Sequence, residues 1–320
     1  MALTNLIEVM HCNNLLDIAE TFRDKNVCLD YLASKRWNGS VYCVFCGCNN
    51  VYTLKGKYRR YKCGDCRKQF SAIKGTIFEN SPIHLQKWFM AIFLITTHKK
   101  GISSVQLASS LGVTQKTAWF MAQRIRYALK IKSFDKKLDG VIQCDETFVG
   151  GKNKNRHAHK KVANSQGRSF KDKTPVLGML HTGGHLRLVV MPDTASASIQ
   201  PAIKEHIEEG SIIVSDEWHG YNGLDKKYFH IVMDHQRKEF VRGAFHTNSM
   251  EGFWGLFKRG IIGVYHYLSR KHLHRYCDEF SYRYNNRDIP NSYKFEGCLS
   301  SVNCRLTYSD LISKNQPAIQ

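Results

Sequence analysis

Two short apolar runs that each end in an aspartate most strongly constrain the fold of this chain. Asp145 follows Val-Ile-Gln-Cys and Asp216 follows Ile-Ile-Val-Ser, so both carboxylates are expected near the carboxyl ends of buried strands. A buried carboxylate is costly unless it is paired, hydrogen-bonded or bound to a metal. One aspartate at a strand end is commonly a cap. Two of them, followed by an acidic residue on a helix, favour a shared metal site.

The third acidic residue lies in HTNSMEGFWGLFKRG, a stretch with helical periodicity. Asn248, Glu251 and Lys258 fall within one arc of roughly 80° at 100° per residue, so they share a helix face. We expect Glu251 to complete the metal site, Asn248 to support a metal or its water, and Lys258 to hold a phosphate. A capping or salt-bridged surface glutamate is the alternative. Glu146 and Glu217 are second choices, because they alternate to the opposite side of their strands.

These ligands indicate a chemistry. Carboxylate and phosphate oxygens are what Mg²⁺ or Mn²⁺ prefers. Two such ions about 3.5–4 Å apart activate a nucleophile and stabilise the leaving oxygen during in-line displacement on DNA, first with water and then with a 3′-hydroxyl. Such an enzyme needs no protein nucleophile. A serine or tyrosine recombinase does, and Tyr221 and Tyr284 remain open for that role.

The charge of the chain indicates its partner. Lys and Arg number 47 against 27 Asp and Glu among 320 residues, which gives a net charge of +20. A protein so basic needs a polyanion or an acidic membrane surface, and charge spread along the chain favours a groove for DNA. The longest apolar run, 88–97, is about half a membrane span. No secretory signal is evident, so we expect no membrane association. The expected location is the bacterial cytoplasm (nucleoid), or the nucleus if the source is eukaryotic.

Four cysteines predict one structural zinc ion. Cys43 and Cys46 form one Cys-x-x-Cys knuckle, Cys63 and Cys66 form another, and 16 residues separate the two. This spacing is typical of a zinc ribbon, in which four thiolates surround Zn²⁺ and leave no open position for water. Cys48 is a fifth cysteine that could compete as a ligand. Buried or redox-active cysteines are the alternative.

Basic residues crowd the ribbon and the segment after it. Residues 102–129 have the cadence of a helix-turn-helix, with Gly112 at the turn and Thr114 as the cap of the second helix. A plain helical hairpin and a merely solvated basic face are the alternatives. The candidate DNA contacts are Lys57, Arg59, Arg60, Lys116, Arg124 and Arg126.

The domain organisation follows from these patterns. Beyond residue 138, three strands linked by hairpins, a crossover helix and a further strand predict a mixed α/β domain of the ribonuclease-H type. A basic insertion occupies 152–173. The predicted fold is a ribonuclease-H-like mixed sheet with flanking helices, preceded by a zinc ribbon and a helix-turn-helix. The segments are an N-terminal helical segment (1–40), the zinc ribbon (41–80), the helix-turn-helix (81–132), the catalytic domain (138–290) and a C-terminal tail (291–320).

The order of these motifs resembles a known family. A zinc ribbon, a helix-turn-helix, CDETFVGGK, SDEWHGY and the block from HTNSMEGFWGLFKRG to RYNNR are similar to insertion-sequence transposases of the ISXO2-like type and their eukaryotic Merlin relatives. The resemblance covers roughly residues 20–290. Val44 stands where the family often has proline, and all four zinc ligands are kept.

The resemblance implies a DDE transposase that binds terminal inverted repeats and performs metal-dependent DNA cleavage and strand transfer. It places the catalytic positions on Asp145, Asp216 and the Asn248/Glu251 pair, with Lys258 nearby. The third position is shared, because family members differ between Asn and Glu. A homodimer is expected, since two transposon ends must be brought together. A non-catalytic, domesticated DNA-binding regulator and a nuclease acting on structured DNA remain as alternatives.

Overall fold

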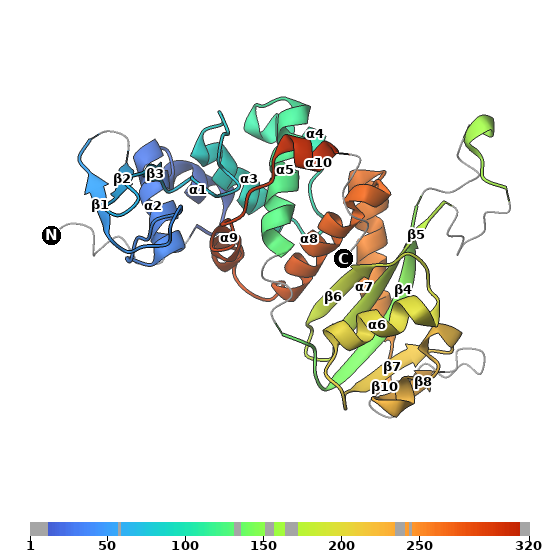
Figure 1. Ribbon diagram of the computed structural model, residues 1–320. Coiled ribbons are helices and arrows are strands. Elements are labelled where there is room, and N and C mark those ends of the chain that lie inside the picture. Colours follow the sequence, from blue (N-terminus) through green and yellow to red (C-terminus); the bar gives the residue numbers. More distant parts are fainter. Residues whose placement is uncertain are drawn as a thin grey trace. The chain divides into compact units, whose positions relative to one another are not determined.

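The computed structural model describes residues 12–56, 59–130, 136–150, 157–163, 172–233, 241–242 and 245–313. The chain divides into two compact units (Figure 1). We call Met1–Ile131 with Asp288–Gln316 the ribbon unit, and Lys132–Arg287 with Pro317–Gln320 the sheet unit. Every described helix is too short or too polar to span a bilayer.

The sheet unit is built on five strands in the order β6-β5-β4-β7-β8. Strands β4, β5 and β6 form an antiparallel meander, whereas β7 runs parallel to β4 and β8 runs parallel to β7. This is the ribonuclease-H-like arrangement that the sequence predicted. The strands are β4 (Val141–Val149), β5 (Thr174–His181), β6 (Leu186–Val190), β7 (Ile212–Asp216) and β8 (Phe229–Met233).

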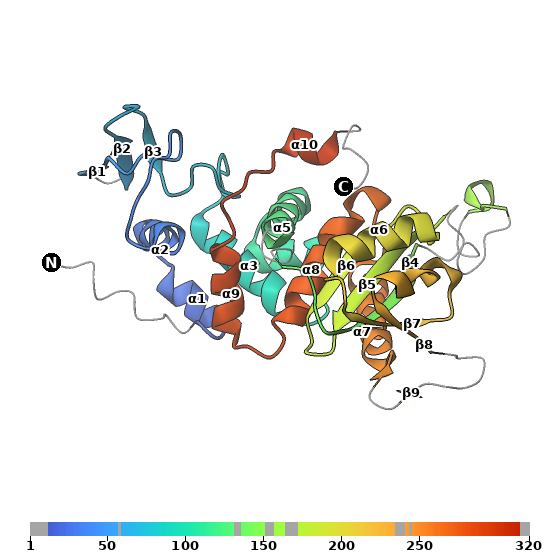
Figure 2. The same cartoon turned by 60° about the horizontal axis from the view of Figure 1, so that its bottom comes forward.

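Helices cover both faces of this sheet. Helix α6 (Ser196–His206) packs on one face, and α7 (Asn248–Gly260) and α8 (Leu273–Asn285) pack on the other (Figure 2). Side chains alternate along each strand. On β5, Leu177 therefore joins the α6 core and Val176 the core under α7 and α8. The two faces of the sheet are thus chemically distinct surfaces.

The ribbon unit begins with two helices and a small antiparallel sheet. Helices α1 (Leu15–Thr21) and α2 (Lys25–Trp37) precede strands β1 (Val51–Leu54), β2 (Arg60–Cys63) and β3 (Gln69–Ser71). The predicted N-terminal helical segment is present, and its residues 1–11 lie outside the described part. The ring centroids of Trp37 and Tyr61 are 5.2 Å apart, and those of the stacked rings of Tyr61 and Phe70 are 5.7 Å apart. Aromatic packing therefore supports the ribbon beside its cysteines.

Three further helices follow in the ribbon unit. They are α3 (Leu85–Thr97), α4 (Ser104–Leu111) and α5 (Gln115–Lys130). Gly112 ends α4 with a left-handed φ of 58°, a backbone angle that glycine adopts without a Cβ clash. The Thr114 hydroxyl accepts a hydrogen bond from the backbone N–H of Thr117 at 3.3 Å, as an N-cap does. The turn between α4 and α5 therefore has the predicted chemistry.

The C-terminal segment adds α9 (Asn291–Leu299) and α10 (Tyr308–Ile312) to the ribbon unit. The Phe295 ring packs 5.8 Å from that of Phe89 on α3, and the backbone N–H of Ile77 donates to the carbonyl of Val302 at 3.1 Å. The sequence assigned only a tail to this region. The short helices carry little periodic signal, and their partners lie more than 200 residues away in the chain.

Candidate active site

Asp145 and Asp216 lie side by side on neighbouring parallel strands. The paired positions Val141–Ile212 and Gln143–Val214 set the register of β4 and β7, and the same offset two residues further joins Asp145 to Asp216. Adjacent strands are about 4.8 Å apart. Cys144 belongs to the core under α6, so by alternation Asp145 faces the α7 side. The sheet therefore brings together two carboxylates that are 71 residues apart in the sequence.

The electrostatics agree with this geometry. Burial raises the pKa of the Asp145 carboxyl to about 6, from an ordinary value of 3.8, and the neighbouring charges of Asp216 and Glu251 add to the rise. Backbone N–H groups hold one oxygen of each aspartate. Glu146 donates to Asp145 Oδ1 at 2.8 Å, and Trp218 donates to Asp216 Oδ1 at 3.1 Å. A divalent cation between these carboxylates would offset their mutual repulsion.

Helix α7 is tied to the same strand. Trp254 Nε1 donates to Asp145 Oδ2 at 3.0 Å, and the backbone N–H of Met250 donates to Gln143 Oε1 at 3.1 Å. Gly178 faces Asp145 across β4 and β5, and a Cβ there would lie 2.7 Å from the Trp254 ring. The missing side chain at Gly178 therefore permits the helix to pack closely against the sheet.

The other predicted residues of α7 lie on its exposed side. Glu251 sits in the first turn, where Thr247 Oγ1 donates to Glu251 Oε1 at 3.3 Å. The charge of Glu251 adds a small part to the raised pKa of Asp145, after burial and the charge of Asp216. Asn248 and Lys258 are exposed on α7. The same helix thus presents the predicted amide, carboxylate and ammonium.

Glu146 and Tyr221 form a separate pair. The Tyr221 hydroxyl donates to Glu146 Oε2 at 2.7 Å, and Tyr221 is fully buried in the core under α6. Glu146 therefore points away from Asp145, as strand alternation predicted. Burial raises the pKa of Tyr221 well above its usual value. A nucleophile must reach the substrate, so the structure argues against Tyr221 in that role. Tyr284 packs on Phe253 at 5.1 Å and supports the core.

The four predicted zinc ligands converge in the ribbon unit. The sulfur atoms of Cys43, Cys46, Cys63 and Cys66 all lie within 4.8 Å of one another, and two pairs are 3.6 Å apart. Tetrahedral zinc–thiolate bonds of about 2.3 Å require sulfurs about 3.8 Å apart. These residues therefore fit a structural zinc ion, as predicted. Cys48 Sγ lies 3.2 Å from Cys63 Sγ, at the edge of the set.

Two predicted DNA contacts prove to be interior residues. Arg124 and Arg126 retain only 5% and 2% of their surface exposed. The guanidinium of Arg124 donates to the backbone carbonyls of Ile77, Glu79 and Leu306 at 2.8–3.1 Å. Arg124 therefore closes the ribbon unit around its C-terminal segment, and we withdraw both arginines as DNA contacts. Helical periodicity alone could not find this role, because its partners come from distant segments.

The remaining basic candidates lie at the surface. Arg60 and Lys116 are exposed, and Arg59 pairs with Asp30 at 3.0 Å. Lys57 lies outside the described residues, as do residues 152–156 and 164–171 of the predicted basic insertion. Arg60 and Lys116 are therefore the candidates that the structure leaves accessible.

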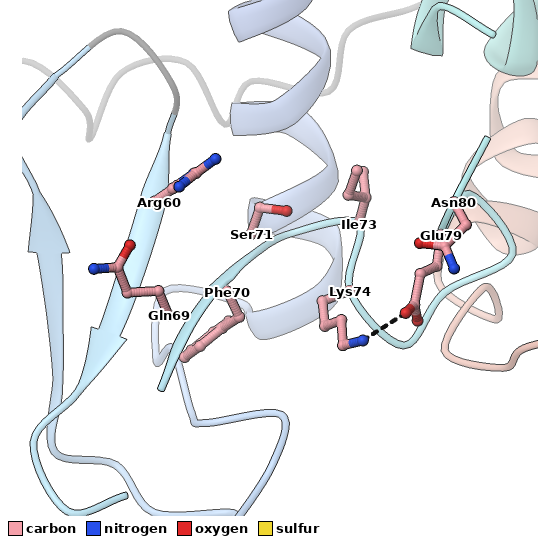
Figure 3. A pocket seen from close by; sticks show the side chains of 8 residues that line it. All are labelled: Arg60, Gln69, Phe70, Ser71, Ile73, Lys74, Glu79 and Asn80. Carbon is pink, nitrogen blue, oxygen red and sulfur yellow. Dashed lines mark hydrogen bonds and ion pairs between the residues drawn. The ribbon is translucent and has the colours of Figure 1, made fainter. Parts of the chain in front are cut away.

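A hollow of about 380 Å³ opens in the ribbon unit beside β2 and β3. Figure 3 shows Lys74 bonded to Glu79, at 2.6 Å, on one side of it. The one carboxylate in the lining is thus already neutralised, so the hollow lacks the ligands of a catalytic metal site. Its lining residues are Arg60, Gln69, Phe70, Ser71, Ile73, Lys74, Glu79 and Asn80.

Two aspartates lie on neighbouring strands of a ribonuclease-H-like sheet, and a glutamate lies on the adjoining helix, as the resemblance to DDE transposases implied. Comparison with protein families agrees with this class. Residues 137–285 match the ISXO2-like transposase domain, and residues 23–69 match the transposase zinc-ribbon domain. The chain belongs to the insertion-sequence transposases that combine these two domains.

Two proteins and one solved structure are similar to this chain. An uncharacterised protein of the transposable element ISH50 from Halobacterium salinarum is 28% identical over 276 residues, which span 82% of this chain and 92% of that protein. A transposase-like protein of Haemophilus influenzae is 29% identical over 102 residues, 32% of this chain and 81% of its own length. A pre-cleavage Mos1 transpososome matches 65% of this chain and 76% of the Mos1 chain, with 14% identity and a TM-score of 0.24.

Proposed function

We propose that this protein binds the terminal inverted repeats of its element and catalyses metal-dependent cleavage and strand transfer of DNA. The observation that supports this most is the in-register placement of Asp145 beside Asp216, next to the helix that bears Glu251. Membership of a transposase family and the net charge of +20 point to the same substrate.

The residues present fit a pair of Mg²⁺ or Mn²⁺ ions. Asp145, Asp216 and Glu251 offer hard oxygen ligands, and Asn248 adds an amide on the same helix. When bound, such ions activate water or a 3′-hydroxyl and stabilise the leaving oxygen. The protein's own part is to orient the carboxylates through backbone N–H groups and Trp254. Lys258, about 10 Å along α7 from Glu251, would hold a phosphate of the bound DNA.

A cleavage assay tests this proposal. Purified protein is mixed with labelled duplex that contains the inverted repeats flanking its gene, with Mg²⁺ or Mn²⁺. Asp145→Asn or Asp216→Asn should lower the nicking rate at least about 1,000-fold, because each removes a ligand charge. Binding to the ends should persist. Asp225→Asn, an exposed carboxylate of the same unit, is the matched control and should cleave normally.

The same assay separates the alternatives. Full cleavage by either aspartate variant would refute the metal assignment. Wild-type protein that binds the ends but nicks them in neither metal would be a non-catalytic regulator. Competition with random duplex at matched salt separates a transposase from a nuclease without sequence preference, because a transposase should favour its own ends.

A further inference from the structure

The segment directly after α7 exposes two large apolar side chains. Residues 261–267 (IIGVYHY), here called the tip, follow the helix that bears Glu251 and Lys258. Tyr267 is 74% exposed, more than any other large apolar side chain among the described residues, and Ile262 is 66% exposed. Single exposed apolar residues are ordinary, but two large ones within six residues are typical of a surface that binds a partner.

The tip is held firmly at both ends. Ile261–Tyr265 continues α7 as a π-helical turn, a form common at functional sites. The Tyr265 hydroxyl donates to Glu279 Oε1 at 2.6 Å, and its ring packs 4.8 Å from that of Tyr276. Leu268, directly after Tyr267, is buried in the core. The backbone therefore presents Ile262 and Tyr267 from an anchored support.

His266, between the anchors, has a left-handed backbone with a φ of 58°. Its ring nitrogen Nδ1 donates a hydrogen bond to the carbonyl oxygen of Ile262 at 2.9 Å. A non-glycine residue in this region costs free energy and persists where the surrounding structure imposes it. The side-chain bond from His266 thus closes the tip on itself and directs the next residue, Tyr267, outward.

The charge around the tip selects the partner. In the sequence, residues 252–277 contain no Asp or Glu but five Lys and Arg, and Glu279, which accepts the hydrogen bond from Tyr265, is fully buried. Lys258 and Arg259, immediately before the tip, are exposed. Protein–protein interface cores are depleted of charged residues, whereas proteins that kink DNA place an apolar wedge between base pairs amid basic phosphate contacts. The surroundings therefore favour a nucleic acid over a second protein surface.

The helix also sets the distance from the candidate metal site. Ile262 follows Glu251 by 11 residues, which is about 16 Å at the rise of an α-helix. Duplex DNA rises about 3.4 Å per base pair, so the tip can reach at most about five base steps from a phosphate held at the carboxylates.

We propose that Ile262 and Tyr267 insert into the bound transposon-end duplex within about five base steps of the cleaved phosphate, where they unstack one step and bend the DNA. This role rests on the proposed function, because it takes the scissile duplex as the ligand. It assigns to the tip a positioning role in the approach of the phosphate to the metal ions.

Fluorescence of 2-aminopurine tests the proposal, because the base brightens when it is unstacked. Full-length Asp145→Asn protein, which should bind without cleaving, is added to end duplexes that carry the probe at single positions within about two to eight base steps of the cleavage site. Fluorescence should rise several-fold at one or two adjacent positions. Tyr267→Ala or Ile262→Ala should return it towards the free-duplex level, and Tyr267→Trp should retain the rise.

Phe229→Ala is the matched control, because Phe229 is 69% exposed at the start of β8, where it pairs with Ile212 at the opposite end of β7 from Asp216. It should leave the fluorescence unchanged. If the protein binds its ends specifically but the fluorescence rises at no position, the proposed insertion of the tip is wrong and the proposed function stands. If the protein fails to bind its ends, the proposed function is wrong as well. If Tyr267→Ala keeps the rise in fluorescence but no longer sediments as a dimer, the tip contacts a second copy of the chain. That result would also refute the insertion into DNA.

Discussion

The indole nitrogen of Trp254 donates a hydrogen bond to Oδ2 of Asp145 across 3.0 Å, joining α7 to β4 at the carboxylate site. A hydrogen bond to a carboxylate favours the ionised form and lowers the pKa. Burial and the charge of Asp216 act on the same group in the opposite direction. Trp254 therefore both positions the helix that bears Glu251 and makes Asp145 easier to ionise.

Trp254→Phe should shift the pH dependence of cleavage to higher pH. Without the indole donor, the pKa of Asp145 should rise above about 6, so the charged ligand forms only at higher pH. Single-turnover nicking with Mn²⁺ as a function of pH measures the midpoint. Trp218→Phe is the control, because that indole donates to the Thr194 carbonyl. Equal midpoints in wild type and Trp254→Phe would contradict the role of the indole.

Asp145→Asn should stabilise the sheet unit in buffer without divalent cations. The pKa of Asp145 is about 6 when folded against an ordinary 3.8, so ionisation lowers the free energy of unfolding as pH rises through this window. The asparagine avoids this cost, which amounts to roughly 1–3 kcal/mol above pH 7 and vanishes below about pH 4. Calorimetric melting at both pH values measures the difference. A gain of equal size at pH 4 would show that charge is not its cause.

Gly178→Ala should displace α7. A Cβ there would lie 2.7 Å from the Trp254 ring and closer still to Met250, and such overpacking costs about 1–3 kcal/mol. Melting temperature and nicking rate should both fall. Gly252→Ala is the paired control, since it adds the same methyl to α7 with nothing within 4 Å and should stabilise the helix by roughly 0.5–1 kcal/mol. A tolerated alanine at 178 would refute the close approach.

Cys63→Ser should release the structural zinc and weaken DNA binding, because it removes one of four thiolates. Cys48→Ser should keep one zinc ion per chain. Cys43, Cys46, Cys63 and Cys66 already supply four thiolates, and Cys48 lies at the edge of this set. Mass spectrometry of bound metal measures both variants. Zinc loss from Cys48→Ser alone would make Cys48 the true fourth ligand.

Arg124→Ala and Arg60→Ala should fail in different ways. Removing Arg124 leaves three buried carbonyls without their donor and should cost about 2–4 kcal/mol of stability. Arg60→Ala should lower the melting temperature less than Arg124→Ala does, but should weaken DNA binding and reduce the salt slope by about one. Melting curves and salt titrations of end binding distinguish the two. A stable Arg124→Ala protein with a reduced salt slope would restore the original prediction of a DNA contact.

The sequence predicted those features whose cause is local or repeated. Cysteine spacing determines the ribbon, because each knuckle supplies two ligands from one turn. Apolar runs predicted that Asp145 and Asp216 lie on strands. Asp216 ends β7 as expected, but the expected place of Asp145 near a carboxyl end was wrong, because β4 continues to Val149 and Asp145 is its middle residue. Helical spacing placed Glu251 on the exposed face of α7. The parallel register that aligns the two aspartates is a long-range property, which one sequence does not reveal.

Features that depend on distant partners were missed. Arg124 has the composition of a DNA contact, and only the carbonyls of Ile77 and Leu306 show that it lies inside. Trp254 is a large aromatic residue typical of a core, and its bond to Asp145 depends on how α7 meets the sheet. The exposure of Tyr267 depends on which distant residues cover its side chain, and one sequence does not reveal them.

The return of the last helices to the ribbon unit has a consequence for synthesis and truncation. Arg124 and Phe89 can contact Leu306 and Phe295 only after these residues have left the ribosome. The ribbon unit, which is synthesised first, therefore finishes folding last. A premature stop codon shortly after residue 287 would spare every carboxylate of the sheet unit. It would nevertheless remove the segment that packs on Phe89 and accepts a hydrogen bond from Arg124. A truncated gene copy would therefore destabilise the ribbon unit while it keeps the acidic residues of the sheet unit.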